Sequence, residues 1–359
     1  MSQNVFVKKQ KQRRVHMNNV TLLGIDLAKD VFQLHGVNEH GKKVLGRKIS
    51  RAALPNFIAN LQPCKIAMEA CGSANYWSRK FMSYGHTVSQ ISPQHVKPFV
   101  QGNKNDKNDA RAIVIASLQD DMPTVSIKSV EQQEVQMLHR YRESLVQDRT
   151  AQANRVRGYL REFGLFIPIG LSQVRKQVPL FLEDAENELT VEMREIISNC
   201  HKKLLDLDQE IEQYTQKIER FCEQNAICQQ LMKLPGVGPM TASIVQATIG
   251  NPGNFKNGRH FSAFLGLVPK EHSSGGKQCL MSISKRGDRY IRSLLVHGGR
   301  AVVQNAGKKD NYLGHWVQRI HKEHGYNKAA VAVANKNARH MWAIMSYGDK
   351  YIDHLKLCA

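Results

Sequence analysis

The stretch Thr21–Val37, TLLGIDLAKDVFQLHGV, constrains the fold of this chain more than any other. Its first residues, Thr21–Ile25, are mostly apolar, which is typical of a strand buried on both faces. Asp26 then places a carboxylate at the carboxyl end of that strand, where open α/β sheets build their sites. A second strand is predicted over Val31–Val37. Asp26 in this position is also compatible with an ordinary acid that caps a turn.

Further strands and helices are predicted after this opening. The turn Asn38–Gly41 leads into a third strand, over Lys43–Ile49. The later elements follow in the order helix, strand, helix, strand, at Ala52–Leu61, Lys65–Ala70, Tyr76–Tyr84 and Thr87–Ile91. Three strands in a meander followed by this alternation predict a mixed sheet with helices on its faces. A strand, an acid and a hairpin in this order is how a ribonuclease H-like nuclease core begins.

Three more acids join Asp26 as candidates for a catalytic site. Glu69 lies at the end of a predicted strand, and Asp106 and Asp109 lie in a polar segment that leads into a helix. Because these two aspartates are three residues apart, both project from one face if the helix begins near Lys104. Acids at a helix N-terminus are also stabilised by the helix dipole, which by itself would explain either one. It explains less well why both occur in a chain that already has acids at two strand ends.

The charge balance predicts a polyanionic partner. The 51 Lys and Arg residues outnumber the 31 Asp and Glu residues, giving a net charge of +20 at pH 7, which favours nucleic acid. The seven cysteines include no CxxC pair, which indicates reduced thiols rather than a disulfide framework or a zinc site. No apolar run approaches the ~18 residues of a membrane span, and the start lacks the apolar segment of a secretory signal. We therefore expect a cytoplasmic protein with no membrane partner.

Two parts of the chain carry basic residues outside the predicted sheet. Residues 1–20 form an arm with several Lys and Arg residues and no acid, and such an arm can lie along a phosphate backbone. From about Glu131 to Cys222 the pattern is mainly that of long helices. The first of these helices carries arginines suited to a phosphate backbone, which are Arg140, Arg142, Arg149, Arg155, Arg157 and Arg161.

The second long helix carries a heptad-like seam. Its apolar residues lie at positions 189, 193, 196, 200, 204, 207, 211, 214, 218 and 221. Steps of three and four residues with one extra four-residue step are typical of a coiled coil with a stutter. This pattern is compatible with an antiparallel hairpin of the two helices, with a dimerising coil, or with an ordinary intramolecular packing face.

The segment Leu231–Ile249, LMKLPGVGPMTASIVQATI, has the pattern of a helix-hairpin-helix motif. An apolar helix is followed by Pro-Gly-Val-Gly and then by another apolar helix. In such a motif the glycine turn presents backbone N–H groups at a helix N-terminus to a phosphate. A simple pair of antiparallel helices would have a similar sequence.

A loop with two serines, His272–Gly276, follows the apolar run that stops at Pro269. Two serines before two glycines usually form only a solvated turn. Here cationic residues that could stabilise a reacting phosphodiester surround them, namely Lys277, Lys285, Arg286, Arg289 and Arg292. The loop is therefore a candidate for a nucleophile, which a metal ion or a nearby base would have to activate.

Together these segments resemble the transposases of the insertion sequence 110 family, in the subgroup of insertion sequence 1111, which is related to Piv-type DNA invertases. The matching stretches cover nearly the whole chain in order. They are GIDLAKDVFQLHG, AMEACGSANYW, QISPQHVKPFVQGNKNDKNDARAI, LPGVGPMTA, FSAFLGLVPKEHSSGGK, ISKRGDRYIRSLLVHGGRAVV and ANKNARHMWA.

The resemblance implies a RuvC-like nuclease domain whose DEDD tetrad falls on Asp26, Glu69, Asp106 and Asp109. It also implies a nucleophilic serine in HSSGG, where Ser274 is favoured over Ser273 because the family pattern keeps the serine immediately before the glycine. The tetrad would hold Mg²⁺ or Mn²⁺ as two ions that stabilise the attacking and leaving oxygens. The implied partners are donor and target DNA, a noncoding guide RNA from the element, and further copies of the chain in a dimer or tetramer.

After the basic arm (1–20), the resemblance implies a RuvC-like domain (21–125), a helical coiled-coil region (126–225) and a mainly helical transposase domain with a helix-hairpin-helix and the serine loop (226–359). The expected fold is thus α/β combined with all-α parts. The expected function is that of an RNA-guided DNA recombinase associated with the bacterial nucleoid. One alternative is a metal-dependent, junction-resolving nuclease that needs the tetrad but not Ser274. The other is a catalytically silent nucleic-acid-binding protein, which would leave the tetrad unexplained.

Overall fold

The computed structural model describes residues 19–101, 106–308, 310–348 and 350–351. The chain divides into two compact units, Met1–Ser129 and Val130–Ala359. The predicted basic arm lies almost entirely outside the described residues, so its conformation stays a prediction. Within the described part of the chain, no helix is both long enough and apolar enough to cross a membrane.

The first unit is built on a mixed sheet, as the order of predicted elements indicated. Six strands lie in the order β3-β2-β1-β4-β5-β6. The central β1 (Leu22–Asp26) is antiparallel to β2 (Val31–Val37) and parallel to β4 (Lys65–Glu69). Outside them lie β3 (Lys43–Ser50), antiparallel to β2, and β5 (Thr87–Ile91), parallel to β4. The two-residue strand β6 (Thr124–Val125) is too short to give a sequence signal and was not predicted.

Each face of this sheet buries its own core. On one face, alternate β1 residues such as Leu23 and Ile25 pack with α1 (Leu54–Ala59) and α2 (Ala74–Met82). On the other face, residues including Leu22 pack with α4 (Asp106–Ser117), and the short α3 (Pro93–Val96) adds to that side. The continuous apolar sequence of β1 follows from burial on both faces, since successive side chains point to opposite sides of a strand.

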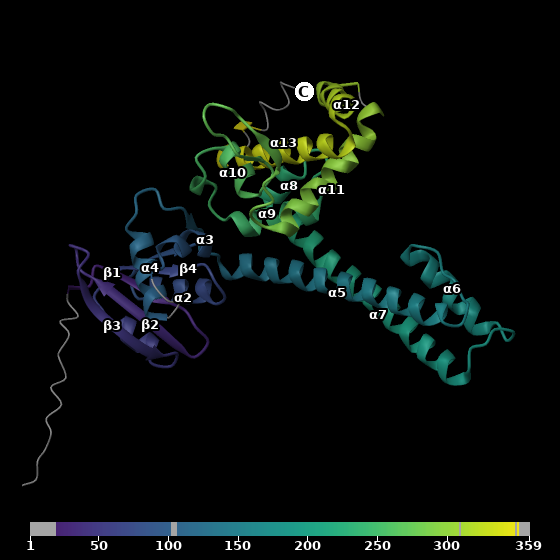
Figure 1. Ribbon diagram of the computed structural model, residues 1–359, viewed down its shortest axis with the longest axis horizontal. Helices are drawn as coiled ribbons and strands as arrows, with labels where there is room; N and C mark the ends of the chain where they lie inside the picture. The colour runs from purple at the N-terminus through teal and green to yellow at the C-terminus, as the bar shows by residue number, and fades with distance from the viewer. Residues whose placement is uncertain (1–18, 102–105, 309, 349, 352–359) are drawn as a thin grey trace, which may run out of the picture. The chain divides into compact units, whose positions relative to one another are not determined.

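Helix α4 lies directly against β1, at Gly24. A Cβ atom at Gly24 would lie 2.6 Å from Val114 Cγ2 and 2.7 Å from the Ala110 carbonyl oxygen, so a side chain here would push the helix away. At the other end of α4, Lys65 Nζ donates to the Ser117 carbonyl oxygen at 3.4 Å. Because Lys65 begins β4 while Ser117 ends α4, the helix runs antiparallel to β4. The N-terminus of α4 therefore lies at the carboxyl ends of β1 and β4 (Figure 1).

The second unit begins with a long antiparallel helix pair. Helices α5 (Val130–Arg161) and α7 (Val191–Gln224) run side by side in Figure 1. Their direction follows from two contacts, Arg142 Nε to Thr215 Oγ1 at 2.7 Å and Gln152 Nε2 to the Cys200 carbonyl oxygen at 3.0 Å. Of the arrangements left open by the heptad pattern, the structure has the intramolecular hairpin. Along the chain, α6 (Leu171–Glu183) comes between α5 and α7, and it is a separate helix that the sequence pattern did not indicate.

The buried seam of α7 differs in part from the predicted one. Ile197 is fully buried, whereas Ile196, which the pattern placed in the seam, is 45% exposed. Two adjacent isoleucines satisfy a three-four spacing equally well, so only the position of the packing partners selects one of them. The buried residues Ile197, Leu204, Ile211 and Ile218 follow one another at seven-residue intervals, as in a coiled coil.

A helical bundle with one hairpin completes the second unit. Its helices are α8 (Ala226–Leu231), α9 (Pro239–Ile249), α10 (Gly258–Phe264), α11 (Arg289–Asn305), α12 (Tyr312–His324) and α13 (Tyr326–Tyr347). The strands β7 (Pro269–Glu271) and β8 (Leu280–Ile283) pair antiparallel between α10 and α11. Helix α13 packs against α8, α10, α11 and α12, and its alanines allow these close contacts.

Candidate active site and nucleic-acid-binding surfaces

Asp26 and Glu69 are the last residues of two neighbouring parallel strands. The register pairs Ile25 of β1 with Met68 of β4, so the two acids follow directly at the same sheet edge. Both side chains are partly exposed. Asp26 points to the same face as Gly24, which is the face covered by α4, because side chains two residues apart share a face. Burial raises the pKa of the Cys71 thiol, and the negative charges of Glu69 and Asp26 raise it further, so both carboxylates act on one nearby group.

Asp106 and Asp109 lie in the first turn of α4, whose N-terminus is at this same edge of the sheet. The position of Lys48 in β3 shows that Asp106 lies near the strand end that carries Asp26. Lys48 Nζ lies 3.9 Å from Asp106 Oδ2, and in the sheet Lys48 stands opposite Gln33, which stands opposite Asp26. The structure therefore places all four acids at one end of the sheet, although they come from three separate elements.

The four carboxylates are oxygen donors of the kind that Mg²⁺ and Mn²⁺ prefer, so the donor chemistry fits a hard divalent cation. Their side chains are not gathered tightly: in the described part of the chain, no group of three or more His, Cys, Asp and Glu residues is arranged to hold a metal ion. Like charges repel, which favours carboxylates that point apart. The two-ion site thus stays a prediction.

The serine segment is a tight hairpin rather than an open loop. Strands β7 and β8 lead to a two-residue turn in which Gly275 and Gly276 have φ angles of +56° and +76°. The Lys277 N–H donates to the Ser274 carbonyl oxygen at 3.1 Å, which closes the turn. Positive φ at both central residues is the type I′ pattern, which matches the twist of the flanking strands and favours glycine. A hairpin of this kind holds Ser274 at its tip.

The two serine hydroxyls differ in their contacts. Ser273 Oγ donates to Glu271 Oε1 at 2.6 Å, whereas Ser274 Oγ makes no hydrogen bond within the described part of the chain. Ser274 is thus the hydroxyl that can approach a phosphodiester without first breaking a contact. Glu271 was not singled out from the sequence. Its position two residues before Ser273, on the same side of an extended strand, was the signal that could have identified it.

The cationic residues near the hairpin fall into two groups. Lys277, Lys285, Arg286 and Arg289 are exposed. Arg292, in contrast, donates from Nη1 to the carbonyl oxygens of Leu265 at 3.1 Å and Arg286 at 2.9 Å. It anchors α11 to the preceding loop, so its guanidinium is less available to a phosphate than those of the exposed residues.

Most arginines of α5 that were predicted to bind nucleic acid have intramolecular acceptors. Arg142 donates to Thr215, Arg155 to Gln152, and Arg157 to the carbonyl oxygen of Gly170 at 2.7 Å. Arg149 Nη1 lies 2.9 Å from Asp208 Oδ1, and Arg175 contacts the same carboxylate. Burial by itself would raise the pKa of Asp208, but the hydrogen bonds from Arg175 and Arg149 outweigh it and hold this pKa below its usual value. Arg140 is exposed, and phosphate binding by the whole set stays a prediction.

A comparison of Arg140 with Arg149 distinguishes an arginine that binds nucleic acid from one that stabilises the fold. We expect Arg140→Gln to weaken nucleic-acid binding, lowering the salt-dependence slope by about 0.9 for a duplex, without changing thermal stability. Arg149→Gln should instead cost roughly 1–2 kcal/mol of stability, because Asp208 loses a charged partner in a partly buried position. Fluorescence anisotropy at several salt concentrations and thermal unfolding measure the two effects. A stability loss in Arg140→Gln with none in Arg149→Gln would reverse the assignment.

The turn of the suspected helix-hairpin-helix motif packs against another helix. Gly236, with φ +78°, lies so close to α11 that a Cβ atom there would be 2.5 Å from the Gly298 carbonyl oxygen. The two glycines allow the turn and α11 to make backbone contact. Gly238, the N-cap residue of α9, is exposed. Phosphate binding at this turn stays a prediction.

Comparisons with known proteins match two family models to this chain. A family model described as "Transposase IS116/IS110/IS902 family" matches residues 228–313, and a DEDD-type IS110 transposase model matches residues 23–164. A transposase for the insertion sequence element IS1111A of Coxiella burnetii is 42% identical over 95% of this chain and 94% of its own length. The chain belongs to the IS110 transposase family. It is accordingly a DNA transposase of an insertion sequence.

Other relatives of this transposase include members beyond insertion elements. A probable family 20 transposase of Pseudomonas aeruginosa is 44% identical over 91% of this chain and 97% of its own length. A pilin gene-inverting protein of Moraxella lacunata is 23% identical over 66% of each chain. The DEDD model spans β1 to the end of α5, and the second model spans α8 to the start of α12, which includes the serine hairpin.

Proposed function

We propose that this transposase is an RNA-guided DNA recombinase of a bacterial insertion sequence that cuts and rejoins DNA through a covalent serine–DNA intermediate. The observation that carries the proposal is the placement of Asp26, Glu69, Asp106 and Asp109 at one end of a mixed sheet. We assign the four parts 1–20, 21–125, 126–225 and 226–359 to a basic arm, a RuvC-like nuclease domain, a coiled-coil region and a transposase domain. Such a protein would act on the bacterial nucleoid in the cytoplasm.

The four acids would hold the divalent cation or cations. Bound Mg²⁺ or Mn²⁺ would lower the pKa of a coordinated hydroxyl and neutralise charge that develops on a phosphodiester. The protein contributes rigid placement of the donors: Asp26 and Glu69 on buried strands, and Asp106 and Asp109 on a helix packed against Gly24. The ion pair between Lys48 and Asp106 would have to break before Asp106 could bind a cation. This costs little free energy because the ion pair is exposed and weak.

Ser274 would supply the nucleophile. Its Oγ attacks the phosphorus, a phosphoserine ester forms, and the displaced sugar oxygen leaves with the proton that the hydroxyl releases. In the reverse direction a sugar hydroxyl of another strand attacks the ester and releases Ser274. Because the ester conserves the energy of the broken bond, strands are rejoined without ATP. The exposed cations Lys277, Lys285 and Arg286 are suited to stabilise the charge on the reacting phosphate.

In this proposal the acids and the serine that act together belong to different copies of the chain, in a dimer or tetramer. The family resemblance supports this arrangement, and the acids and the serine belong to different compact units of the chain. Ser274 is exposed at the hairpin tip, and apart from chain neighbours no described residue lies within 4 Å of a Cβ built on Gly275 or Gly276, so Ser274 is accessible to a partner.

We expect the purified protein to carry RNA. A net charge of +20 favours a polyanion, and the proposed guide is a noncoding RNA encoded beside the gene. Gentle purification from cells that contain the whole element, followed by extraction and sequencing, should yield one dominant RNA from the flanking region. The matched control is the same protein expressed without the flanking DNA, which should yield no such species. Recovery of only heterogeneous RNA in both preparations favours a nuclease without a guide.

A further inference from the structure

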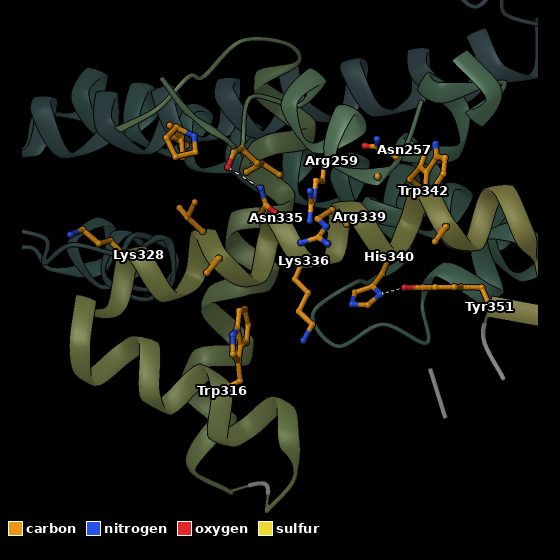
Figure 2. Close-up of a pocket in the computed structure, with 17 residues that line it drawn as sticks. Asn257, Arg259, Trp316, Lys328, Asn335, Lys336, Arg339, His340, Trp342 and Tyr351 are labelled. Atoms are coloured by element: carbon orange, nitrogen blue, oxygen red, sulfur yellow. Dashed lines mark hydrogen bonds between the residues drawn. The ribbon is translucent and has the colours of Figure 1, made fainter. Parts of the chain in front are cut away.

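A basic, aromatic-lined groove lies in the second unit, whereas the four acids belong to the first. It encloses about 890 Å³ between α10, the base of the β7–β8 hairpin, α12 and α13. Figure 2 shows Arg259, Lys336 and Arg339 projecting into it, with Trp316 on one side and His340 and Tyr351 on another. Lys336, Arg339 and His340 belong to the matching stretch ANKNARHMWA, to which the sequence analysis assigned no role.

The groove carries positive charge without compensation. Arg259, Lys328, Lys336 and Arg339 line it, and no Asp or Glu occurs among its described lining residues. Burial, and then the charge of Arg339, lower the pKa of Lys336. Burial, followed by the charges of Lys336 and Arg339, lowers the pKa of His340 to about 4. The positive charges in the groove thus have no negative partner among its described lining residues, and a bound anionic ligand can neutralise them.

Of these cations, Lys336 is held in place by contacts of its side chain, whereas Arg259, Lys328 and Arg339 are exposed. Lys336 Nζ lies over the rings of Trp316 at 4.7 Å and Tyr312 at 5.2 Å, both on α12. The backbone of Arg339 packs against α10, because a Cβ at Gly258 would lie 2.9 Å from the Arg339 carbonyl oxygen. Tyr351 OH lies 2.6 Å from His340 Nδ1. Because Lys336 is already held against the rings of Trp316 and Tyr312, it loses little side-chain entropy when it binds an anion.

The groove also has aromatic surface. Trp316 is half-buried, and Trp342 is held by a hydrogen bond from Nε1 to the Pro252 carbonyl oxygen at 3.1 Å. Cationic grooves with aromatic walls are typical of sites for unpaired nucleic-acid strands, in which phosphates meet Lys and Arg and bases pack on rings. A volume within the range of small-ligand pockets, ~300–1,000 Å³, accepts a few nucleotides of one strand rather than the side of a duplex.

We propose that this groove binds a short unpaired segment of a nucleic-acid strand, with phosphates at Arg259, Lys336 and Arg339 and bases against the aromatic walls. An acidic peptide would satisfy the charge but would make no use of the flat rings beside it. The chain is a DNA transposase, so its known class of partner has the required chemistry.

The position of the groove links it to the serine hairpin. Pro269 of β7 and Ile283 of β8 form part of its wall. Ser274 is five residues beyond Pro269, which at about 3.3 Å per residue amounts to at most ~16 Å of extended chain. A strand in the groove can therefore continue to the hairpin tip within a few nucleotides. Only this last step rests on the proposed role of Ser274; the binding site itself does not.

Binding of fluorescein-labelled ten-nucleotide strands to the full-length protein tests the proposal. The double variant Lys336→Gln/Arg339→Gln should bind single strands roughly 10-fold or more weakly, and the slope of log K against log salt should fall by about 1.4. The matched control is Arg319→Gln/Lys322→Gln, which removes two exposed cations of α12 outside the groove and should bind as wild type. DNA and RNA strands of one sequence, measured in parallel, identify which strand the groove prefers.

A second measurement guards against loss of folding. Photocrosslinking of a strand containing 5-bromouracil to the unmodified protein should join it to peptides that contain Trp316 of α12, His340 of α13 or Tyr351. Thermal unfolding of the double variant should match that of the control double variant. The proposal is overturned if both double variants bind alike, or if all crosslinks map outside the groove.

Discussion

Asp26→Asn should abolish DNA strand transfer, by about 10³-fold or more, while the protein still folds and binds DNA. The amide keeps the size of the carboxylate but removes one of the negative charges that would hold the divalent cation. Loss of a metal ion that stabilises the reacting phosphate costs several kcal/mol, and each 1.36 kcal/mol is a factor of ten in rate. The measurement is strand transfer between donor and target DNA in Mg²⁺ and in Mn²⁺, with thermal unfolding and DNA binding measured alongside.

The matched control is Asp30→Asn. Asp30 is an exposed acid in the turn between β1 and β2, and it lies a few residues beyond Asp26 without sharing the strand end. This variant should transfer strands at the wild-type rate. Wild-type activity in Asp26→Asn would remove this residue from the metal site. The expectation for Glu69→Gln is the same as for Asp26→Asn, since Glu69 ends the adjacent parallel strand.

Ser274→Ala should eliminate the covalent protein–DNA adduct and recombination, while DNA binding is retained. The hydroxyl is the atom that would form the ester with DNA, and alanine keeps the hairpin because the turn is closed by backbone atoms of residues 274 and 277. A nicked DNA substrate traps the intermediate, and mass spectrometry of the denatured mixture detects the adduct. Because serine and acids would act as one unit, combining Ser274→Ala with Asp26→Asn should cost little more than either change alone.

Ser273→Ala is the matched control for the nucleophile. It removes a neighbouring hydroxyl together with its hydrogen bond to Glu271, and the adduct should persist. If instead the adduct persists in Ser274→Ala and disappears in Ser273→Ala, the nucleophile is Ser273, with Glu271 placed to accept its proton. An active preparation without any adduct would favour a hydrolytic, junction-resolving nuclease.

Local sequence determined five of the six strands of the first unit, β1 to β5, and the acids that end β1 and β4. Apolar runs of strand length, bounded by turn residues, place β1 to β5 within one or two residues of the predicted limits. This works because burial on both faces and turn chemistry are read from neighbouring residues. For the same reason the Gly-Gly pair marked the turn beside Ser274. Its hairpin geometry became clear only from the paired strands on either side.

Only the tertiary structure decided which residues meet. The parallel pairing of β1 with β4 sets Asp26 beside Glu69, and the contact at Gly24 brings the N-terminus of α4 to them. The packing partners of α7 likewise determined that Ile197, rather than Ile196, is buried. Arg149, which the sequence predicted to bind nucleic acid, forms an ion pair with Asp208. The groove around Lys336 draws on α10, the hairpin, α12 and α13. Contacts between distant segments depend on how whole faces pack, and a periodic pattern reports which face is buried but not what covers it.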